Sequence, residues 1–236
     1  MSREFIDQYL KETEEIIRDV DRAEIEKFIN ILFDAWKNGR KIITMGNGGS
    51  SSTASHFAGD LLKTVVNESS MKEINDIKGF RAMCLNDNQP ALTAWINDVG
   101  WDKAYSGFLN TLLEERDIVL LISVHGGSGW SGNLVHAMEL AKKRKAKILG
   151  LAGFDGGKMK EMCDSCIVVP KNSTPHTEGF HGVIQHLIVF RLKEMILEHA
   201  TGSKEYKLRE LLEESSSEIL RKKLQELISV KTKAKN

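Results

Sequence analysis

The clearest structural signal in this 236-residue chain is the segment KIITMGNGGSSSTASHFAGDL, residues 41–61. It begins with a short apolar run at 41–45, which passes into a glycine-rich turn and then into a stretch where apolar residues recur at helical spacing. A strand that feeds a helix through a tight glycine turn is typical of the repeating unit of a parallel sheet. We therefore predict an α/β fold.

The same alternation continues in both directions along the chain. Two amphipathic stretches, 4–20 and 24–36, predict helices ahead of the first strand, and 178–199 predicts a long helix near the end. Five predicted strands that alternate with helices imply a parallel sheet covered on both faces. The four further strands are predicted at 82–85, 117–124, 147–152 and 166–169.

The composition disfavours several classes of protein. The chain carries 33 Lys and Arg against 33 Asp and Glu, so its formal net charge is zero, whereas nucleic acids and anionic membranes favour a strong positive excess. Three cysteines are too few for a disulfide framework, which points to the cytoplasm. We find no signal peptide and no apolar run of membrane-spanning length, and we expect neither a nucleic acid nor a membrane as partner.

The glycine turn after the first predicted strand suits an anion. Gly48 and Gly49 let the backbone turn sharply, and Ser50 and Ser51 then open a helix whose unpaired N–H groups and hydroxyls can bind a phosphate. An ordinary strand-to-helix turn with serine as the helix cap is the alternative. The segment matches neither a dinucleotide-binding fingerprint nor a P-loop, so it disfavours nucleotide binding.

Histidines and carboxylates occur at helical spacing on two predicted helices. His56 and Asp60 are four residues apart, so both project from one helix face, as shared metal ligands or a base with its orienting partner do. A surface hydrogen bond is the plainer interpretation of that pair. Glu178 and His186 are eight residues apart, roughly on one face of the later helix. The sequence alone does not show that the two sets converge.

A second loop, SVHGGSGWSGN at 123–133, repeats the order of apolar strand, glycine- and serine-rich loop, and helix. Ser123, Ser128 and Ser131 carry hydroxyls that can donate to a phosphate, and His125 can add positive charge. This loop is therefore a second candidate for phosphate binding.

Five motifs together resemble a known family. They are GNGGSSSTASHFAGDL (46–61), ALTAWINDVGWDKAYS (91–106), ISVHGGS (122–128), GLAGFDGGKMKEMCD (150–164) and the helix that carries Glu178 and His186. With these motifs in this order, the chain resembles the sugar isomerase (SIS) domain family, specifically its phosphoheptose isomerase group. The resemblance covers roughly the first 200 residues.

The resemblance implies a flavodoxin-like αβα sandwich with a five-stranded parallel sheet, assembled as a homotetramer with its sites between subunits. On this basis residues 1–202 form a single SIS domain, in which the N-terminal helices of 1–37 pack in the oligomer. Residues 203–236 form a charged helical C-terminal extension that the resemblance does not explain.

The resemblance also implies a reaction, the interconversion of a ketose phosphate and an aldose phosphate through an enediol. Sedoheptulose 7-phosphate and D-glycero-D-manno-heptose 7-phosphate are the expected pair. Asp60 then matches the catalytic base and His186 the opposing acid or base, and some members hold zinc between such residues. Matched to zinc ligands are His56, Asp60, Glu178 and His186. Matched to substrate or phosphate contacts are Gly48, Gly49, Ser50, Ser51, Asn97, Asp98, Ser123, His125, Ser128 and Glu178.

The chain departs from the family pattern at three places. Asp60 stands where glutamate is usual, Glu178 stands where glutamine is usual, and the second loop is longer, with His125 where a hydroxyl is expected. The shorter Asp60 side chain retracts the carboxylate in a geometry that catalysis tolerates poorly. Two neutral imidazoles and two carboxylates, however, balance a divalent cation and suit tetrahedral zinc. We therefore expect one zinc ion per site.

Three other functions remain open from the sequence. Relatives with this fold serve as binding and assembly proteins, such as a replication-initiation factor, and such a protein need not keep the histidines and carboxylates. The chain can instead be an isomerase of another sugar phosphate, because the second loop changes the substrate surroundings. A sugar phosphate sensor would bind its ligand without turnover.

Overall fold

The structure is a computed structural model that describes residues 2–66 and 77–201. The predicted C-terminal extension, 203–236, lies outside the described residues, so the division of the chain at residue 202 stays a prediction. Helices α1 (Ser2–Asp19) and α2 (Arg22–Lys37) come first. Asp21 caps α2, because its carboxylate accepts hydrogen bonds from the N–H groups of Ala23 and Glu24.

Five parallel strands form one sheet in the order β2-β1-β3-β4-β5. The prediction of a five-stranded parallel sheet is therefore confirmed, and the strand order is that of flavodoxin-like folds. The strands are β1 (Lys41–Gly46), β2 (Arg81–Cys84), β3 (Ile118–Ser123), β4 (Lys147–Gly153) and β5 (Ser165–Val169).

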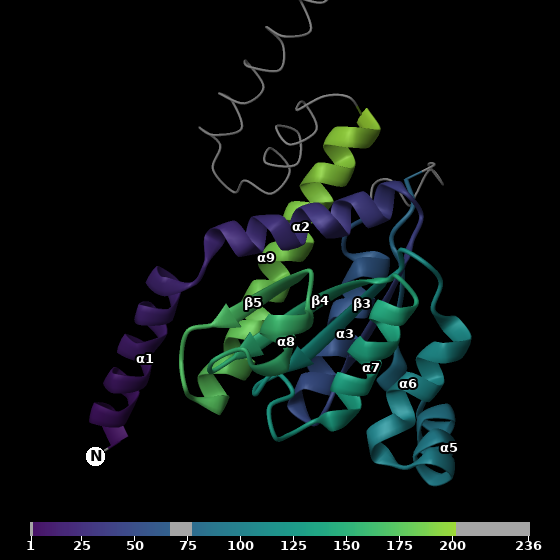
Figure 1. Cartoon of the computed structure of the whole chain (residues 1–236). Helices are drawn as coiled ribbons and strands as arrows, with labels where there is room; N and C mark the ends of the chain where they lie inside the picture. Colours follow the sequence, from purple (N-terminus) through teal and green to yellow (C-terminus); the bar gives the residue numbers. More distant parts are fainter. Residues whose placement is uncertain (1, 67–76, 202–236) are drawn as a thin grey trace, which may run out of the picture.

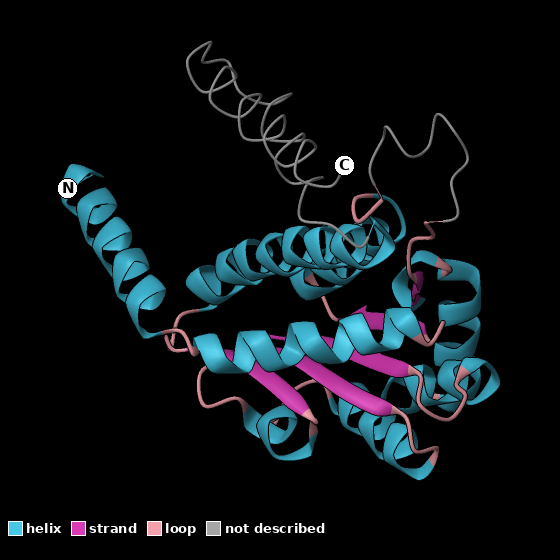
Figure 2. Cartoon of the chain, turned by 90° about the horizontal axis from the view of Figure 1, so that it is seen from above, coloured by secondary structure: helices cyan, strands magenta, loops and turns pink. Residues whose placement is uncertain are grey.

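Helices cover both faces of the sheet, as Figures 1 and 2 show. On one face lie α2, α3 and α9, and on the other lie α6, α7 and α8, with α5 packed against α6. A short 3-10 helix, η1 (Leu85–Asp87), follows β2. The helices after β1 are α3 (Gly49–Lys63), α5 (Gln89–Val99), α6 (Trp101–Leu112), α7 (Gly132–Lys143), α8 (Gly157–Met162) and α9 (Thr174–Thr201).

The core consists of two apolar clusters, one on each side of the sheet. Strand residues alternate between them, so that Ile42 joins the cluster under α2, α3 and α9, while Ile43 joins the opposite one. Both side chains are fully buried, which explains why the strands read as continuous apolar runs in the sequence.

Helix α1 extends away from the body of the molecule (Figures 1 and 2). Its middle is attached to the start of α9, where the rings of Tyr9 and His176 stack with centroids 3.9 Å apart. Its first half leaves Phe5 and Ile6 exposed. An exposed apolar face on a projecting helix is the kind of surface that an oligomer covers.

In the described part of the chain, no helix has both the length and the apolar character needed to cross a bilayer.

The strand order also shows where a ligand is expected. The chain leaves β1 toward α3 on one face of the sheet and leaves β3 toward α7 on the other face. Between these neighbouring strands the direction of winding reverses, and ligands of open α/β sheets bind outside the carboxyl ends of the strands at such a point. Both glycine-rich loops lie there.

Candidate active site

The turn between β1 and α3 presents free backbone donors. Gly48 has a φ of 55°, and α3 begins at Gly49 without a side-chain cap. The Ser51 hydroxyl donates to the Gly48 carbonyl oxygen at 2.7 Å. Gly46 cannot be replaced freely, because a Cβ there would lie 2.6 Å from the Ser50 carbonyl oxygen. The turn therefore leaves the positive end of α3 open to an anion.

A cavity of about 330 Å³ opens in front of this turn. It brings together the start of α3, the end of β3 and the start of α9. No Lys or Arg is among its lining residues, so an anion there must be held by N–H groups, hydroxyls and the dipole of α3. The lining residues are Asn47, Gly48, Gly49, Ser50, Ile122, Ser123, Val124, His125, Trp130, Ser131, Thr174 and Glu178.

The second loop contributes to two adjoining cavities. Ser123, His125 and Ser131 line the first cavity, whereas Ser128 lines a neighbouring one of about 290 Å³. The His125 ring packs against Phe154 with centroids 4.4 Å apart and forms a wall of both cavities. Among the serines left open by the sequence, Ser131 thus shares the cavity of the first loop, and the contact predicted for Ser128 stays a prediction.

A buried polar network fixes the end of β1 under the cavity. The Tyr105 hydroxyl donates to the Gly46 carbonyl oxygen at 2.6 Å, and the Asn86 amide donates to the same oxygen at 3.0 Å. Asn47 and Asn133 exchange two amide hydrogen bonds of 2.9 and 3.0 Å. Burial raises the pKa of Tyr105 to about 12, so its hydroxyl stays a donor. The network holds the glycine turn in one position.

The structure brings His56, Asp60 and His186 together, although they come from two helices. His56 Nε2 lies 3.4 Å and His186 Nε2 lies 3.7 Å from Asp60 Oδ2. The two imidazole rings meet edge to face, with centroids 5.0 Å apart. Because α3 packs against α9, the spacing of four residues on one helix becomes a cluster of three side chains.

Asp60 is held by two neighbours that the sequence did not single out as site residues. The Thr64 hydroxyl donates to Asp60 Oδ1 at 2.8 Å, and the Gln185 amide donates to Asp60 Oδ2 at 3.1 Å. Gln185 is fully buried, while the Asp60 side chain retains 13% exposure. Both carboxylate oxygens therefore accept a hydrogen bond and stay accessible from one side.

The three clustered side chains fit a metal ion. One ligand atom from each lies within 4.8 Å of the other two. Two imidazole nitrogens and one carboxylate oxygen form a ligand set that zinc takes in sites with an open position. The half-exposed His56 and His186 rings leave that position accessible.

Glu178, predicted as the fourth ligand, lies elsewhere in this chain. Its carboxylate lines the cavity of about 330 Å³, where a Cβ on Gly49 would be 2.7 Å from its Oε1. Eight residues of α9 separate it from His186, which is about 12 Å along the helix. Among the described residues, the side chains close enough to hold one ion are His56, Asp60 and His186, and Glu178 is not one of them. Its role as the fourth ligand stays a prediction.

Asn97 and Asp98 lie near the end of α5, outside the cavities described above. Both are exposed, and the Asn97 amide donates to Asp98 Oδ1 at 3.0 Å. Their predicted contacts with sugar hydroxyls stay predictions.

The cavity and the cluster lie at opposite ends of α3. Eleven residues separate Gly49 from Asp60, which is about 16 Å along the helix axis. This distance is longer than an extended seven-carbon sugar phosphate itself. The exposed apolar side chains Val183, Leu187 and Phe190 surround His186 on the open face of α9.

A cavity at the reversal point of a parallel sheet, together with a carboxylate of α3 that lies beside histidines of α3 and α9, defines an α/β protein with a candidate site outside the carboxyl ends of its strands. Comparison with known proteins makes this class specific. The SIS domain family matches residues 5–153. The phosphoheptose isomerase of Aliarcobacter butzleri is 34% identical over 190 residues, covering 80% of this chain and 95% of that protein.

Two further comparisons agree. The lincomycin biosynthesis protein LmbN of Streptomyces lincolnensis is 38% identical over 165 residues, covering 67% of this chain and 58% of that protein. A phosphoheptose isomerase structure from Francisella tularensis has the same fold, with a TM-score of 0.72 at 24% identity over 82% of this chain and 98% of that chain. The chain belongs to the SIS domain family and, within it, to the phosphoheptose isomerase group. It is an isomerase.

Proposed function

We propose that this isomerase interconverts sedoheptulose 7-phosphate and an aldose heptose 7-phosphate, D-glycero-D-manno-heptose 7-phosphate. The observation that carries the proposal is the convergence of His56, Asp60 and His186 from two helices. A mere binding or assembly protein has no need of a carboxylate held on both oxygens beside two imidazoles. The name of the Aliarcobacter butzleri relative supports the heptose as substrate.

The cavity at the start of α3 is proposed to hold the phosphate. Gly48, Gly49 and Ser50 offer N–H groups at the positive end of the helix, and Ser123 adds a hydroxyl at the end of β3. A neutral chain needs no cationic field for this task, because a single phosphate is satisfied by local donors.

Asp60 and His186 are proposed to move the protons. Isomerisation from the ketose removes a proton from C1, passes through an enediol, and returns a proton to C2, while a proton shifts from the C1 hydroxyl to the C2 oxygen. Asp60, with both oxygens held by Thr64 and Gln185, serves as the carbon base. His186 serves the oxygens as acid and base. Fixed hydrogen bonds keep the carboxylate at the position that carbon acid chemistry requires.

Zinc is the metal that we propose for the cluster, held by His56, Asp60 and His186. When bound, it would supply polarisation of the sugar carbonyl and of the developing oxyanion in place of the His186 imidazole, whose ligating nitrogen would then carry no proton. Asp60 has two oxygens, so ligation by one leaves the other for the proton. If Glu178 is the fourth ligand, as the sequence predicts, it must come from a neighbouring subunit.

The same distances support a site shared between subunits. The phosphate cavity and the cluster of one chain lie farther apart along α3 than the length of an extended sugar phosphate. We therefore propose that the cavity and Glu178 of one subunit face the cluster of a neighbour in a homotetramer. The exposed Val183, Leu187 and Phe190 beside His186 support a covered surface there.

Turnover of ketose phosphates by the protein tests the proposed function. Sedoheptulose 7-phosphate, a pentulose phosphate and a hexulose phosphate are incubated with the protein, and aldose formation is followed by NMR with and without chelator. Asp60→Asn should abolish turnover and retain sugar phosphate binding. Glu139→Gln is the matched control, because Glu139 also faces a histidine on a helix, His136 at 3.1 Å, but lies outside the site. Binding by the unaltered protein without conversion of any sugar would refute the proposal and indicate a sensor or scaffold.

A different sugar phosphate as substrate is the second candidate. Trp130 and His125 from the longer second loop line the phosphate cavity and its neighbour, so they narrow the space next to the phosphate. In the same assay, turnover of the pentulose or hexulose phosphate alone would select this candidate.

A further inference from the structure

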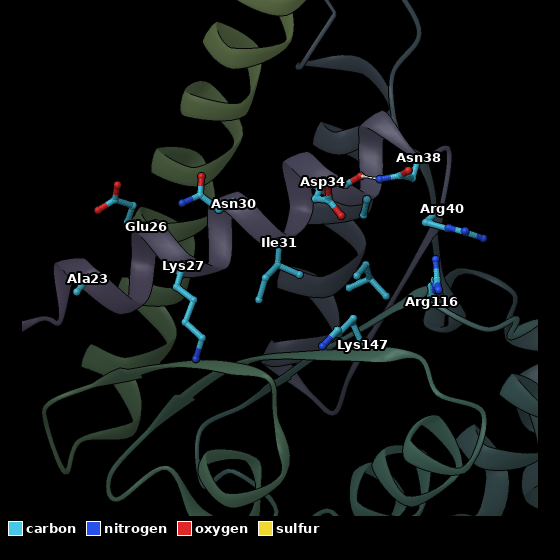
Figure 3. Close-up of a pocket in the computed structure, with 12 residues that line it drawn as sticks. Ala23, Glu26, Lys27, Asn30, Ile31, Asp34, Asn38, Arg40, Arg116 and Lys147 are labelled. Atoms are coloured by element: carbon cyan, nitrogen blue, oxygen red, sulfur yellow. Dashed lines mark hydrogen bonds between the residues drawn. The ribbon is translucent and has the colours of Figure 1, made fainter.

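A cavity of about 760 Å³ lies at the amino ends of the strands, opposite the end that carries the candidate active site. It runs between α2 and the amino ends of the central strands, and Figure 3 shows its lining. Ile31 and Ala35 of α2 and Ile118 of β3 form apolar walls. The residues proposed for catalysis and phosphate binding do not contribute to it.

Cations gather at one end of this cavity because of the strand register. Ile42 of β1 pairs with Ile118 of β3, so Arg40 and Arg116, each two residues earlier, come to lie at equivalent places on neighbouring segments. Lys147 pairs with Ile118 on the next strand. Figure 3 shows Arg40 and Arg116 together at one end, with Glu26 at the other. The end near β1 and β3 therefore carries concentrated positive charge.

Most other charges around the cavity are neutralised locally. Lys147 forms an ion pair with Asp164 at 2.6 Å, and Asp34 forms one with Lys37 at 3.3 Å. Lys27 lies 3.4 Å from Glu24. By contrast, Arg40 and Arg116 have no carboxylate partner among the described residues.

The two arginines are not needed to cap the neighbouring helices. The carbonyl oxygen of Asp34 in the last turn of α2 accepts hydrogen bonds from the backbone and side-chain amides of Asn38. The carbonyl oxygen of Leu112 at the end of α6 accepts one from Lys41 Nζ at 2.7 Å. Two guanidinium groups that serve neither a carboxylate nor a helix end are available to bind an anion that lies between them.

We infer that this cavity binds an organic phosphate of nucleotide size. The phosphate would lie between Arg40 and Arg116, whose planar groups match phosphate oxygens. A flat base would lie along Ile31 and Ala35, and the amide of Asn30 can pair with its polar edge. The volume is that of a small-molecule site. This inference is independent of the proposed sugar substrate.

The test is calorimetric titration of the full chain with ADP, AMP and inorganic phosphate. We expect saturable ADP binding, tighter than that of inorganic phosphate because the base adds contacts. The double variant Arg40→Gln/Arg116→Gln should weaken ADP binding by about tenfold or more. Lys143→Gln removes an exposed cation from the same edge without lining the cavity, and it should leave ADP binding within about twofold of the unaltered chain.

A second variant keeps the inference falsifiable if the double arginine variant unfolds. Ile31→Trp fills the apolar part of the cavity and leaves both arginines in place, so it should weaken ADP binding and leave the weak binding of inorganic phosphate unchanged. Three results would overturn the inference: no saturable ADP binding, equal weakening by Lys143→Gln, or displacement of ADP by sedoheptulose 7-phosphate. The last result would place the nucleotide in the phosphate cavity of the active site.

Discussion

The buried side chain of Gln185 donates a hydrogen bond from Nε2 to Asp60 Oδ2 at 3.1 Å, while its own Oε1 has no hydrogen-bond partner among the described residues. A buried amide with one unsatisfied oxygen costs stability, because the oxygen loses its hydrogen bonds to water. The contact with Asp60 offsets part of this cost and fixes the carboxylate. Gln185 is thus a positioning residue for the proposed base.

Replacing Gln185 with methionine should lower kcat by about tenfold and change KM by less than about twofold, because the carboxylate loses one of its two fixed hydrogen bonds. Methionine has a similar volume and removes the unsatisfied oxygen, so the free energy of unfolding should change by less than about 1 kcal/mol. Steady-state kinetics and urea unfolding measure the two quantities.

Gln8→Met is the control for this variant. Gln8 also donates to a carboxylate on its own helix, Glu12 at 2.7 Å, but on the exposed surface of α1. It should leave kcat unchanged. An unaltered kcat in Gln185→Met would show that Asp60 needs only the hydrogen bond from Thr64.

The fold could be predicted from the sequence because the signals are local. Buried apolar runs, glycine turns and helical periodicity each lie within about twenty residues, and together they give the βα units and a sheet with both faces covered. His56 and Asp60 could be predicted as a pair for the same reason, since a spacing of four residues places side chains on one helix face.

The support of Asp60 could not be predicted in the same way. Thr64 and Gln185 are common residues with no characteristic spacing, and Gln185 contacts Asp60 only because α3 and α9 pack side by side. The place of the Glu178 side chain, beside Gly49 and apart from the cluster, could not be predicted for a related reason. Eight residues place it on the same helix face as His186, but the rise of the helix separates the two groups.

Zinc content tests the metal site. Protein purified without chelator should contain one zinc per chain, and His56→Asn or His186→Asn should lose it, because two remaining ligands bind zinc weakly. Glu178→Gln should weaken zinc binding without abolishing it, since an amide oxygen replaces a carboxylate supplied by a neighbouring subunit. His136→Asn, which alters an exposed histidine of α7, is the control. Elemental analysis that finds no metal would refute the zinc proposal.

Acid stability should depend on His181. Its ring is buried under the sheet with Nε2 3.1 Å from the Ala152 carbonyl oxygen, and burial lowers its pKa from 6.5 to about 4. The unfolded chain therefore takes up a proton between pH 6.5 and 4 that the folded chain does not. The stabilisation that His181 contributes is fully present above pH 6.5 and is lost as the pH falls toward 4, by up to about 3 kcal/mol.

His181→Gln keeps a donor for the Ala152 carbonyl oxygen and removes the titrating group. Urea unfolding at pH 7 and pH 4.5 should show a smaller loss of unfolding free energy for this variant than for the unaltered chain. His136→Asn again serves as the control, since His136 is exposed. Equal losses in His181→Gln and the unaltered chain would contradict the assignment.

Subunit complementation tests the shared site. Asp60→Asn inactivates the cluster, and Ser131→Asp places a negative charge in the phosphate cavity at a position whose φ of 59° aspartate tolerates. Each variant alone should be inactive. The two variants are refolded together in equal amounts so that their subunits assemble at random. About a quarter of the activity should return. A site is intact only when its cavity comes from an Asp60→Asn subunit and its cluster from a Ser131→Asp subunit, and each of these has a chance of about one half.

The pair Asp60→Asn and His186→Asn is the matched control for complementation. Both changes lie in the cluster, so every mixed site contains one of them and no activity should return. A lack of recovery with Asp60→Asn and Ser131→Asp as well would mean that each site is built within one chain. In that case one sugar phosphate would have to bridge the two ends of α3 in the same chain, where Gly49 and Asp60 are about 16 Å apart along the helix axis.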